Sequence, residues 1–191
     1  MKVIERPGFI GVFGGGQLAR KTTLAAHALG YGVRILDPDP HCAAAGVCDE
    51  LITASFDDPA AATQLAERCE VVTVDREDIG QDALLAAQKT CRVSPSPDIL
   101  AMVQDRQTQR EWLRKSEFPI PAVRFVDSVS ALDDAVAELG RPCFVKASRG
   151  GFDDAAALRY ELMGLGEVFV ARHPHLAASV IAATRRLDEA R

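Results

Sequence analysis

The sequence has 191 residues and a mass of 20.5 kDa, and its 48% hydrophobic and 26% charged residues are typical of a folded globular protein, not of a disordered, collagen-like or coiled-coil chain. The formal net charge of −5 argues against a nucleic-acid partner, because such a partner usually meets a basic surface. No apolar run approaches the ~18 residues that a membrane-spanning helix needs, and the amino-terminal stretch lacks the pattern of a signal peptide, so we expect a cytoplasmic protein without a membrane partner.

Strands and helices alternate along the first half of the chain. Four strands are expected, over residues 9–13, 33–36, 51–54 and 71–74. The first strand runs into a glycine-rich turn and a helix that Gly30 ends. A later helix opens with Asp58 as its N-cap and Pro59 as its first residue. This alternation predicts an α/β fold with a doubly wound parallel sheet over residues 1–95.

A second domain is expected over residues 96–170. It follows alternating serines and prolines at residues 94–97, where each proline restricts the residue before it and a helix rarely continues. Its expected elements are one long polar helix over about 98–116, an extended segment over 119–126, a helix capped by Ser128 and a strand over 143–146. An amphipathic helix is expected last, over residues 171–191, with an apolar side made by Leu176, Val180, Ile181 and Leu187.

The glycine-rich turn is the first candidate site. Gly14, Gly15 and Gly16 join a strand to a helix, so the backbone can approach a ligand closely and the helix N-terminus offers N–H groups to an anion. Two other interpretations are open at this point. Gly14, Gly16 and Ala19, with Asp37 about twenty residues further on to hold a ribose, fit a nicotinamide dinucleotide. Alternatively, the turn only connects a strand to a helix and binds nothing.

No metal site is expected. The five cysteines include no Cys-x-x-Cys pair, which argues against a zinc site, and their odd number argues against a disulfide framework. His173 and His175 are two residues apart, but no acid or cysteine lies beside them to complete a set of ligands. We therefore expect these histidines to be a solvated helix start.

Six short motifs carry a resemblance to a known family. In chain order they are Gly14–Arg20, Leu36–Pro40, Val71–Thr73 with Glu77, Ser94–Pro97, Gln104–Arg106 and Lys146–Asp153. In this order the sequence resembles the N5-carboxyaminoimidazole ribonucleotide synthetases, the ATPase subunits of phosphoribosylaminoimidazole carboxylase, which are ATP-grasp enzymes of purine biosynthesis. The resemblance extends from about Gly8 to Asp153. It implies a Rossmann-like pre-ATP-grasp domain over residues 1–95 and a partial ATP-grasp small lobe over residues 96–170.

The resemblance also implies an activity and a set of site residues. The activity is the ATP-dependent carboxylation of aminoimidazole ribonucleotide by bicarbonate through an acyl phosphate, with Mg²⁺ bridging the ATP phosphates. Matching positions imply substrate-binding roles for Gly14, Gly15, Gly16, Gln17, Leu18, Glu77 and Asp153. Arg106 and Lys146 match the two basic residues that hold ATP phosphates, where fixed cations stabilise the charge of a transferring phosphoryl group.

The chain departs from the family pattern in two places. The family's Glu-Phe-Glu-Asn stretch is Asp-Arg-Glu-Asp here, at residues 75–78, and the Gly-Lys-Gly-Gln that follows the equivalent of Asp153 is Asp-Ala-Ala-Ala, at residues 154–157. The added carboxylate of Asp154 would repel a triphosphate by roughly 1 kcal/mol or more. Residues 154–191 are also too few for the family's large lobe and its acidic magnesium ligands. We therefore expect ribonucleotide or nucleotide binding without catalysis by these residues alone.

Two further function classes stay open on the sequence. One is a non-catalytic assembly or protein-interaction module, in which apolar surface left by the absent lobe is covered by the last helix, a partner subunit or self-association. On this ground we expect a homo-oligomer or a completing partner subunit. The other class is an NAD(P)-binding protein, which the glycine turn permits. Binding measurements separate the three classes. The enzyme relative should bind a ribonucleotide or nucleotide, the NAD(P)-binding protein should bind a dinucleotide, and the assembly module should be a stable oligomer that binds neither.

Overall fold

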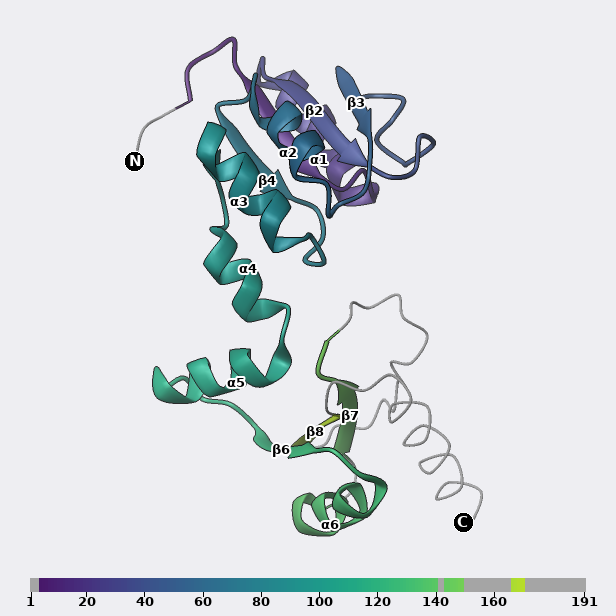
Figure 1. The fold of residues 1–191 in the computed structure, drawn as a ribbon, viewed down its shortest axis with the longest axis vertical. Coiled ribbons are helices and arrows are strands. Elements are labelled where there is room, and N and C mark those ends of the chain that lie inside the picture. The colour runs from purple at the N-terminus through teal and green to yellow at the C-terminus, as the bar shows by residue number, and fades with distance from the viewer. Residues whose placement is uncertain (1–3, 141–142, 150–165, 171–191) are drawn as a thin grey trace. The chain divides into compact units, whose positions relative to one another are not determined.

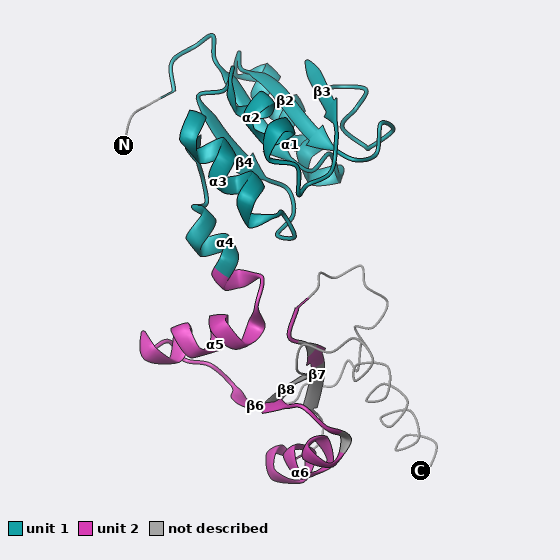
Figure 2. Ribbon diagram, in the orientation of Figure 1, with its two compact units in different colours: residues 1–101 teal, residues 102–191 magenta. Residues whose placement is uncertain are grey.

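The computed structural model describes residues 4–140, 143–149 and 166–170. The chain divides into two compact units, residues 1–101 (unit 1) and residues 102–191 (unit 2), shown in Figure 2, and each unit is described by itself. The division falls inside a helix, a few residues beyond the serine and proline stretch. The final helix expected from the sequence lies outside the described residues. None of the helices within these residues is both long and apolar enough to cross a membrane.

The described part of unit 1 contains a five-stranded parallel sheet in the order β3-β2-β1-β4-β5. Its strands β2, β3 and β4 are labelled in Figure 1. Its strands are β1 (Phe9–Phe13), β2 (Gly32–Asp37), β3 (Glu50–Thr53), β4 (Val71–Val74) and β5 (Arg92–Val93). The four predicted strands are confirmed to within one residue at each end. Because β1 lies in the middle, the chain crosses from one side of it to the other between β3 and β4. The sheet is therefore doubly wound, as predicted.

Helices cover both faces of this sheet. The helix α1 (Gln17–Ala28) packs against one face in a buried cluster of Val12, Ala19, Ala26, Val33, Ile35 and Ala44. The helix α2 (Pro59–Ala66) lies against the opposite face, where a Cβ atom added to Gly11 would meet Leu65 at 3.2 Å. The helix α3 (Gln81–Thr90) packs beside α2. Alternate residues of β1 therefore face different helices, which explains why the whole strand is apolar.

The predicted helix ends in unit 1 are confirmed. Gly30 directly follows the C-cap residue of α1 and has a φ of +82°, a conformation that glycine adopts without strain. At the start of α2, the side chain of Asp58 accepts hydrogen bonds from the N–H groups of Ala60 and Ala61. Pro59 takes the first helical position, where no N–H is needed.

A buried arginine ties β2 to β3 and to α2. The side chain of Arg34 is 4% exposed and forms a two-pronged ion pair with Glu50, at 2.8 Å from Nε and 2.7 Å from Nη2. Its Nη1 donates to the carbonyl oxygens of Gln64 and Leu65, at 2.7 and 2.8 Å. Hydrogen bonding to Arg34 lowers the pKa of the Glu50 carboxyl. Arg34 therefore stabilises the last turn of α2 as well as the pairing of β2 with β3.

Unit 2 contains a second parallel sheet, in which the described strands have the order β6-β8-β7. The strands are β6 (Ala122–Val126), β7 (Cys143–Ala147) and β8 (Gly166–Val170). The helix α6 (Val129–Leu139) begins as predicted at Ser128, whose hydroxyl accepts from the N–H of Ala131 at 3.2 Å. Its buried residues Leu132 and Ala135 cluster with Val126 of β6.

One prediction about the helices was wrong. The sequence suggested a single polar helix over about 98–116, whereas the structure has two, α4 (Pro97–Val103) and α5 (Arg106–Lys115). The break is at Asp105, whose backbone is extended and whose carboxylate accepts from the N–H of Thr108 at 3.0 Å. Aspartate favours such an N-cap over a helix interior, because its side chain competes for backbone N–H groups.

Candidate functional site

The glycine-rich turn lies where the sheet changes its winding direction. It leaves the carboxyl end of β1, between β2 and β4, and leads into α1 on one face. In open α/β sheets this point leaves a crevice in which ligands bind. Asp37 ends β2 and Asp75 follows β4, so two acidic residues flank the turn from the neighbouring strands.

Two carboxylates hold the turn in place. Oδ2 of Asp37 accepts from the N–H of Gly15 at 2.7 Å, and Oδ2 of Asp75 accepts from the N–H of Gly16 at 2.9 Å. The other oxygen of Asp37 accepts from the N–H of Asp39, and Asp37 is 8% exposed. Both glycine N–H groups are thus already bonded within the protein. Asp37 is placed to stabilise the turn, and its burial disfavours the ribose contact of the dinucleotide interpretation.

Space and backbone conformation both require glycine in this turn. A Cβ atom on Gly15 would lie 2.3 Å from Sγ of Cys42, and one on Gly16 would lie 2.5 Å from Oδ2 of Asp75. Gly14 has a φ of +96°, which other residues adopt only with strain. Side chains on these residues would push Cys42 or Asp75 away from the turn.

The first turn of α1 leaves N–H donors open. Gly16, at the N-cap, contributes no side chain to cap them, and the turn carries no acidic residue. The first hydrogen bond of the helix is donated by the N–H of Arg20. Within the described ranges, the backbone N–H groups of Gln17, Leu18 and Ala19, which come before it, have no hydrogen-bond acceptor. Leu18 is 66% exposed. This end of α1 can therefore receive an anion from solvent.

The stretch after β4 brings a cation beside the turn. Arg76 stands where the related family has phenylalanine, and its Cζ lies 5.0 Å from the centre of the Phe56 ring. Its guanidinium pairs with the Asp78 carboxylate, which lowers the pKa of Asp78. A Cβ on Gly14 would lie 3.4 Å from Cγ of Arg76. Glu77, the family-matched acid, has an exposed side chain.

In unit 2 a backbone hydrogen bond brings the two expected nucleotide-binding residues near each other. The N–H of Arg106, the first residue of α5, donates to the carbonyl oxygen of Ser148 at 2.9 Å. Lys146 lies in β7, two residues before Ser148. The start of α5 and the carboxyl end of β7 are therefore joined. Asp153, the last expected site residue, lies outside the described residues.

The donor set in unit 2 fits an anion better than a metal ion. Arg106 and Lys146 can meet ATP phosphates, whereas Mg²⁺ prefers oxygen ligands such as carboxylates. Over the described residues no group of three histidine, cysteine or acidic side chains is placed to hold a metal ion. These two cations therefore suit an anionic group such as a phosphate, and the described residues offer Mg²⁺ no set of three protein ligands.

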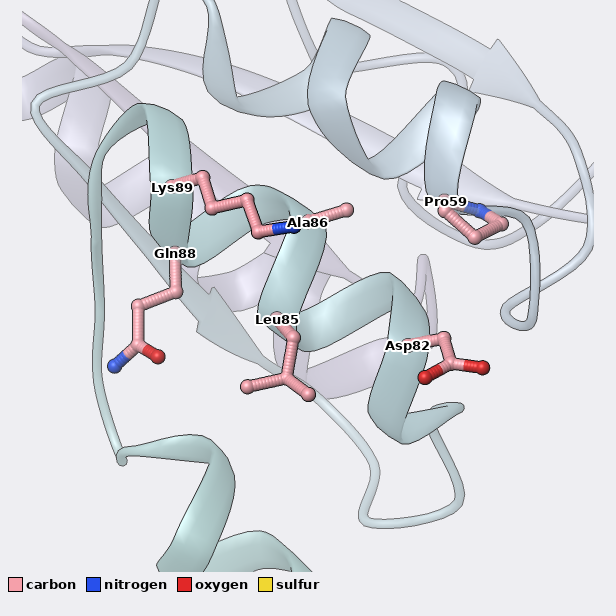
Figure 3. Close-up of a pocket in the computed structure, with 6 residues that line it drawn as sticks. All are labelled: Pro59, Asp82, Leu85, Ala86, Gln88 and Lys89. Atoms are coloured by element: carbon pink, nitrogen blue, oxygen red, sulfur yellow. The ribbon is translucent and has the colours of Figure 1, made fainter.

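A separate pocket lies on the surface of α2 and α3. It has a volume of about 530 Å³ and is lined by Pro59, Asp82, Leu85, Ala86, Gln88 and Lys89 (Figure 3). Leu85 is 44% exposed, and the two charged side chains have opposite signs. None of the expected site residues lines this pocket, so it is not part of the candidate site.

Sequence reasoning missed the residues that hold the expected ones in place. Asp75 bonds Gly16 across 59 residues of sequence, and no local pattern indicates such a contact. Asp105, which caps α5, had a local signal because an acidic residue three positions before Thr108 is a common N-cap arrangement.

Comparison with known proteins gives a consistent result. Residues 8–104 match the model of the ribonucleotide synthetase preATP-grasp domain. N5-carboxyaminoimidazole ribonucleotide synthase of Brucella melitensis is 36% identical over 159 residues, which cover 83% of this chain and 44% of that protein. The solved structure of an ADP complex of N5-carboxyaminoimidazole ribonucleotide synthetase (PurK) superposes with a TM-score of 0.72 at 36% identity, covering 80% of this chain and 41% of the other.

A second similar structure holds both a nucleotide and a ribonucleotide. It is N5-carboxyaminoimidazole synthase of Aspergillus clavatus in complex with ADP and 5-aminoimidazole ribonucleotide, with a TM-score of 0.56 and 29% identity over 71% of this chain and 37% of that one. The chain thus spans less than half the length of the relatives it matches. With its preATP-grasp domain and its parallel α/β sheet, this chain belongs to the N5-carboxyaminoimidazole ribonucleotide synthetase family.

Proposed function

We propose that unit 1 binds aminoimidazole ribonucleotide at the turn after β1, as part of the ATP-dependent synthesis of N5-carboxyaminoimidazole ribonucleotide. The observation that carries the proposal is the set of N–H donors at Gln17, Leu18 and Ala19, for which the described residues offer no acceptor. A phosphate group suits such a helix start, because the N–H groups and the helix dipole both favour an anion. The ribonucleotide bound by the Aspergillus clavatus relative supports this choice of ligand.

Charges around the turn decide how strongly a phosphate binds. Two unit charges about 7 Å apart interact by roughly 2 kcal/mol at an effective dielectric constant of 20, so Asp37 and Asp75 oppose an incoming phosphate. Arg20, in α1 itself, and Arg76, beside Gly14, supply two positive charges on the same edge of the sheet. Because the guanidinium of Arg76 is already paired with the Asp78 carboxylate, these side chains supply no net positive charge, and the N–H donors of α1 are the main attraction for the phosphate.

Replacing Gln17 with proline tests this role of the backbone directly. Proline is favoured at the first helical position, and Gly16 before it has the extended conformation that proline requires, with φ −70° and ψ −169°. The variant should fold and lose one N–H donor. Since a hydrogen bond to a charged group contributes about 1.5–3 kcal/mol, calorimetric titration should show at least tenfold weaker ribonucleotide binding than in Gln17→Ala.

The alanine variant is the matched control, because it removes the same side chain and keeps the N–H group. It separates any contact of the Gln17 amide from the contact of the backbone. Equal ribonucleotide affinity in Gln17→Pro and Gln17→Ala, with both variants folded by circular dichroism, contradicts the proposal.

Unit 2 contributes Arg106 and Lys146, which hold the ATP phosphates in this proposal. Supporting it, the hydrogen bond from Arg106 to Ser148 brings the start of α5 to the end of β7, so both cations belong to one small region. Relatives of this chain have been solved with ADP and with ATP. Two cations in one region give a phosphate-binding surface that does not need unit 1.

These 191 residues are not expected to complete the carboxylation by themselves. They span less than half of their relatives, and residues 154–157 replace a family loop that carries a lysine with one that carries an added carboxylate. The measurement is phosphate release from ATP with aminoimidazole ribonucleotide, bicarbonate and Mg²⁺. Release that requires all substrates and is lost in the Arg106→Ala, Lys146→Ala double variant contradicts this expectation.

A further inference from the structure

A buried carboxylate, Asp105, directly precedes Arg106 of the candidate nucleotide site in unit 2. Asp105 is 1% exposed, although it is charged and stands between two helices. Its Oδ1 accepts from the N–H of Thr108 at 3.0 Å, and its Oδ2 accepts from Nε of Arg149 at 3.1 Å. A carboxylate this buried is stable only while it keeps such partners.

Arg149 is held by this carboxylate through one edge of its guanidinium. The contact uses Nε, while the side chain as a whole is 56% exposed. An arginine side chain has five N–H donors in a fixed plane, four of them on the two terminal nitrogens. Among the described residues, no acceptor bonds those four. Asp105 thus fixes the plane of the guanidinium and leaves its outer edge to solvent.

The same carboxylate connects Arg149 to the two nucleotide-binding candidates. Arg106 follows Asp105 directly and donates its N–H to the carbonyl oxygen of Ser148, the residue before Arg149. Lys146 lies near the end of β7, three residues before Arg149, which follows the strand. Arg149 is therefore joined to Asp105 through its side chain, and its neighbour Ser148 is joined to Arg106 through the backbone, so Arg149 belongs to the same region as the two nucleotide-binding candidates.

We infer that Arg149 binds an oxygen of a nucleotide phosphate beyond the α-phosphate and that Asp105 is the residue that positions it. The ligand class is a nucleoside di- or triphosphate, whose oxygens match the paired donors of a guanidinium. A guanidinium already fixed at Nε loses less side-chain freedom on binding than a free one. The inference rests on the proposed function, because it assigns a third cation to the same nucleotide site.

The test is calorimetric titration of the 191-residue chain with ADP and with AMP. Arg149→Gln should weaken ADP binding about tenfold or more, the effect of losing a charged hydrogen bond, and should weaken AMP binding less, so that the ratio of the two affinities falls. Arg149→Lys should recover only part of the loss, since lysine keeps the charge and lacks the planar donors. Arg114→Gln is the matched control, because it changes an arginine at the far end of α5.

A positioning role of Asp105 predicts the same change in the ADP-to-AMP ratio for Asp105→Asn, whose amide can still accept from Thr108 but pairs poorly with Arg149. A mere loss of stability would lower both affinities equally. If ADP binds the wild type and Arg106→Gln weakens it while Arg149→Gln does not, the inference is overturned and the proposed nucleotide site stands. If the folded wild type binds no ADP, both are overturned.

Discussion

Replacing Arg34 with methionine is expected to lower the free energy of unfolding by about 3 kcal/mol, the range found when one partner of a buried ion pair is removed. Methionine has a similar length and no charge. It would leave the carboxylate of Glu50 without its two-pronged partner. Because the Glu50 side chain is 36% exposed and can be hydrated, the larger share of the loss comes from the buried arginine's other contacts.

The other contacts of the Arg34 guanidinium are with the carboxyl end of α2. The carbonyl oxygens of Gln64 and Leu65 belong to the last turn of α2, where carbonyl groups lack partners within the helix. No basic residue of α2 itself lies in that turn. A cation at a helix C-terminus is favourable, and in this protein it is supplied by Arg34 from the neighbouring strand.

Urea unfolding followed by circular dichroism measures the effect. Arg92→Met is the control, because Arg92 is an exposed arginine of the same sheet and its loss should change stability by less than about 0.5 kcal/mol. Arg34→Lys should not restore stability, since an ammonium cannot meet two carboxylate oxygens and two carbonyl groups at once. Equal unfolding midpoints for Arg34→Met and Arg92→Met contradict the account of Arg34.

The second large effect is expected from Gly15→Ala. The added Cβ would lie 2.3 Å from Sγ and 3.0 Å from Cβ of Cys42, so either the turn or the loop that carries Cys42 must move. Overpacking of this kind costs about 1–3 kcal/mol. Because the N–H of Gly15 is bonded to Asp37, a shift of the turn also disturbs that bond, and ribonucleotide affinity should fall together with stability.

A double variant separates this clash from a general intolerance of the turn. Cys42→Gly removes both atoms that the new Cβ would meet, so Gly15→Ala should cost less in its presence than alone. The remaining contact, with Cγ2 of Ile35 at 3.3 Å, predicts that the recovery is partial. The proposed clash is contradicted if the two single changes are additive in the double variant, both in the free energy of unfolding and in ribonucleotide affinity.

Local patterns predicted most of unit 1. The strands, the glycine that ends α1 and the Asp58 cap of α2 each depend on neighbouring residues, and the structure confirms them. Residues from about 98 to 116 were predicted to form a single helix, because their polar sequence suits a helix throughout. Asp105 breaks it through a cap to Thr108, and its carboxylate is also paired with Arg149, a residue 44 positions away.

The candidate site shows the same limit more clearly. The sequence located the turn at Gly14–Gly16, because glycines between a strand and a helix are a local signal. It did not show that Asp37 and Asp75 already bond two of its N–H groups, since those contacts span 22 and 59 residues. Such pairings follow from the order of the strands in the sheet, which local periodicity does not determine.

The most direct test of the account is calorimetric titration of the wild-type chain with aminoimidazole ribonucleotide, on material whose mass in solution has been fixed by light scattering. The mass also tests the expected self-association. Ribonucleotide binding should be saturable, and it should be at least tenfold weaker in Gln17→Pro than in Gln17→Ala. A folded chain of defined mass that releases no heat with the ribonucleotide, and shows no binding by a second method, contradicts the central claim that the turn after β1 holds this ligand.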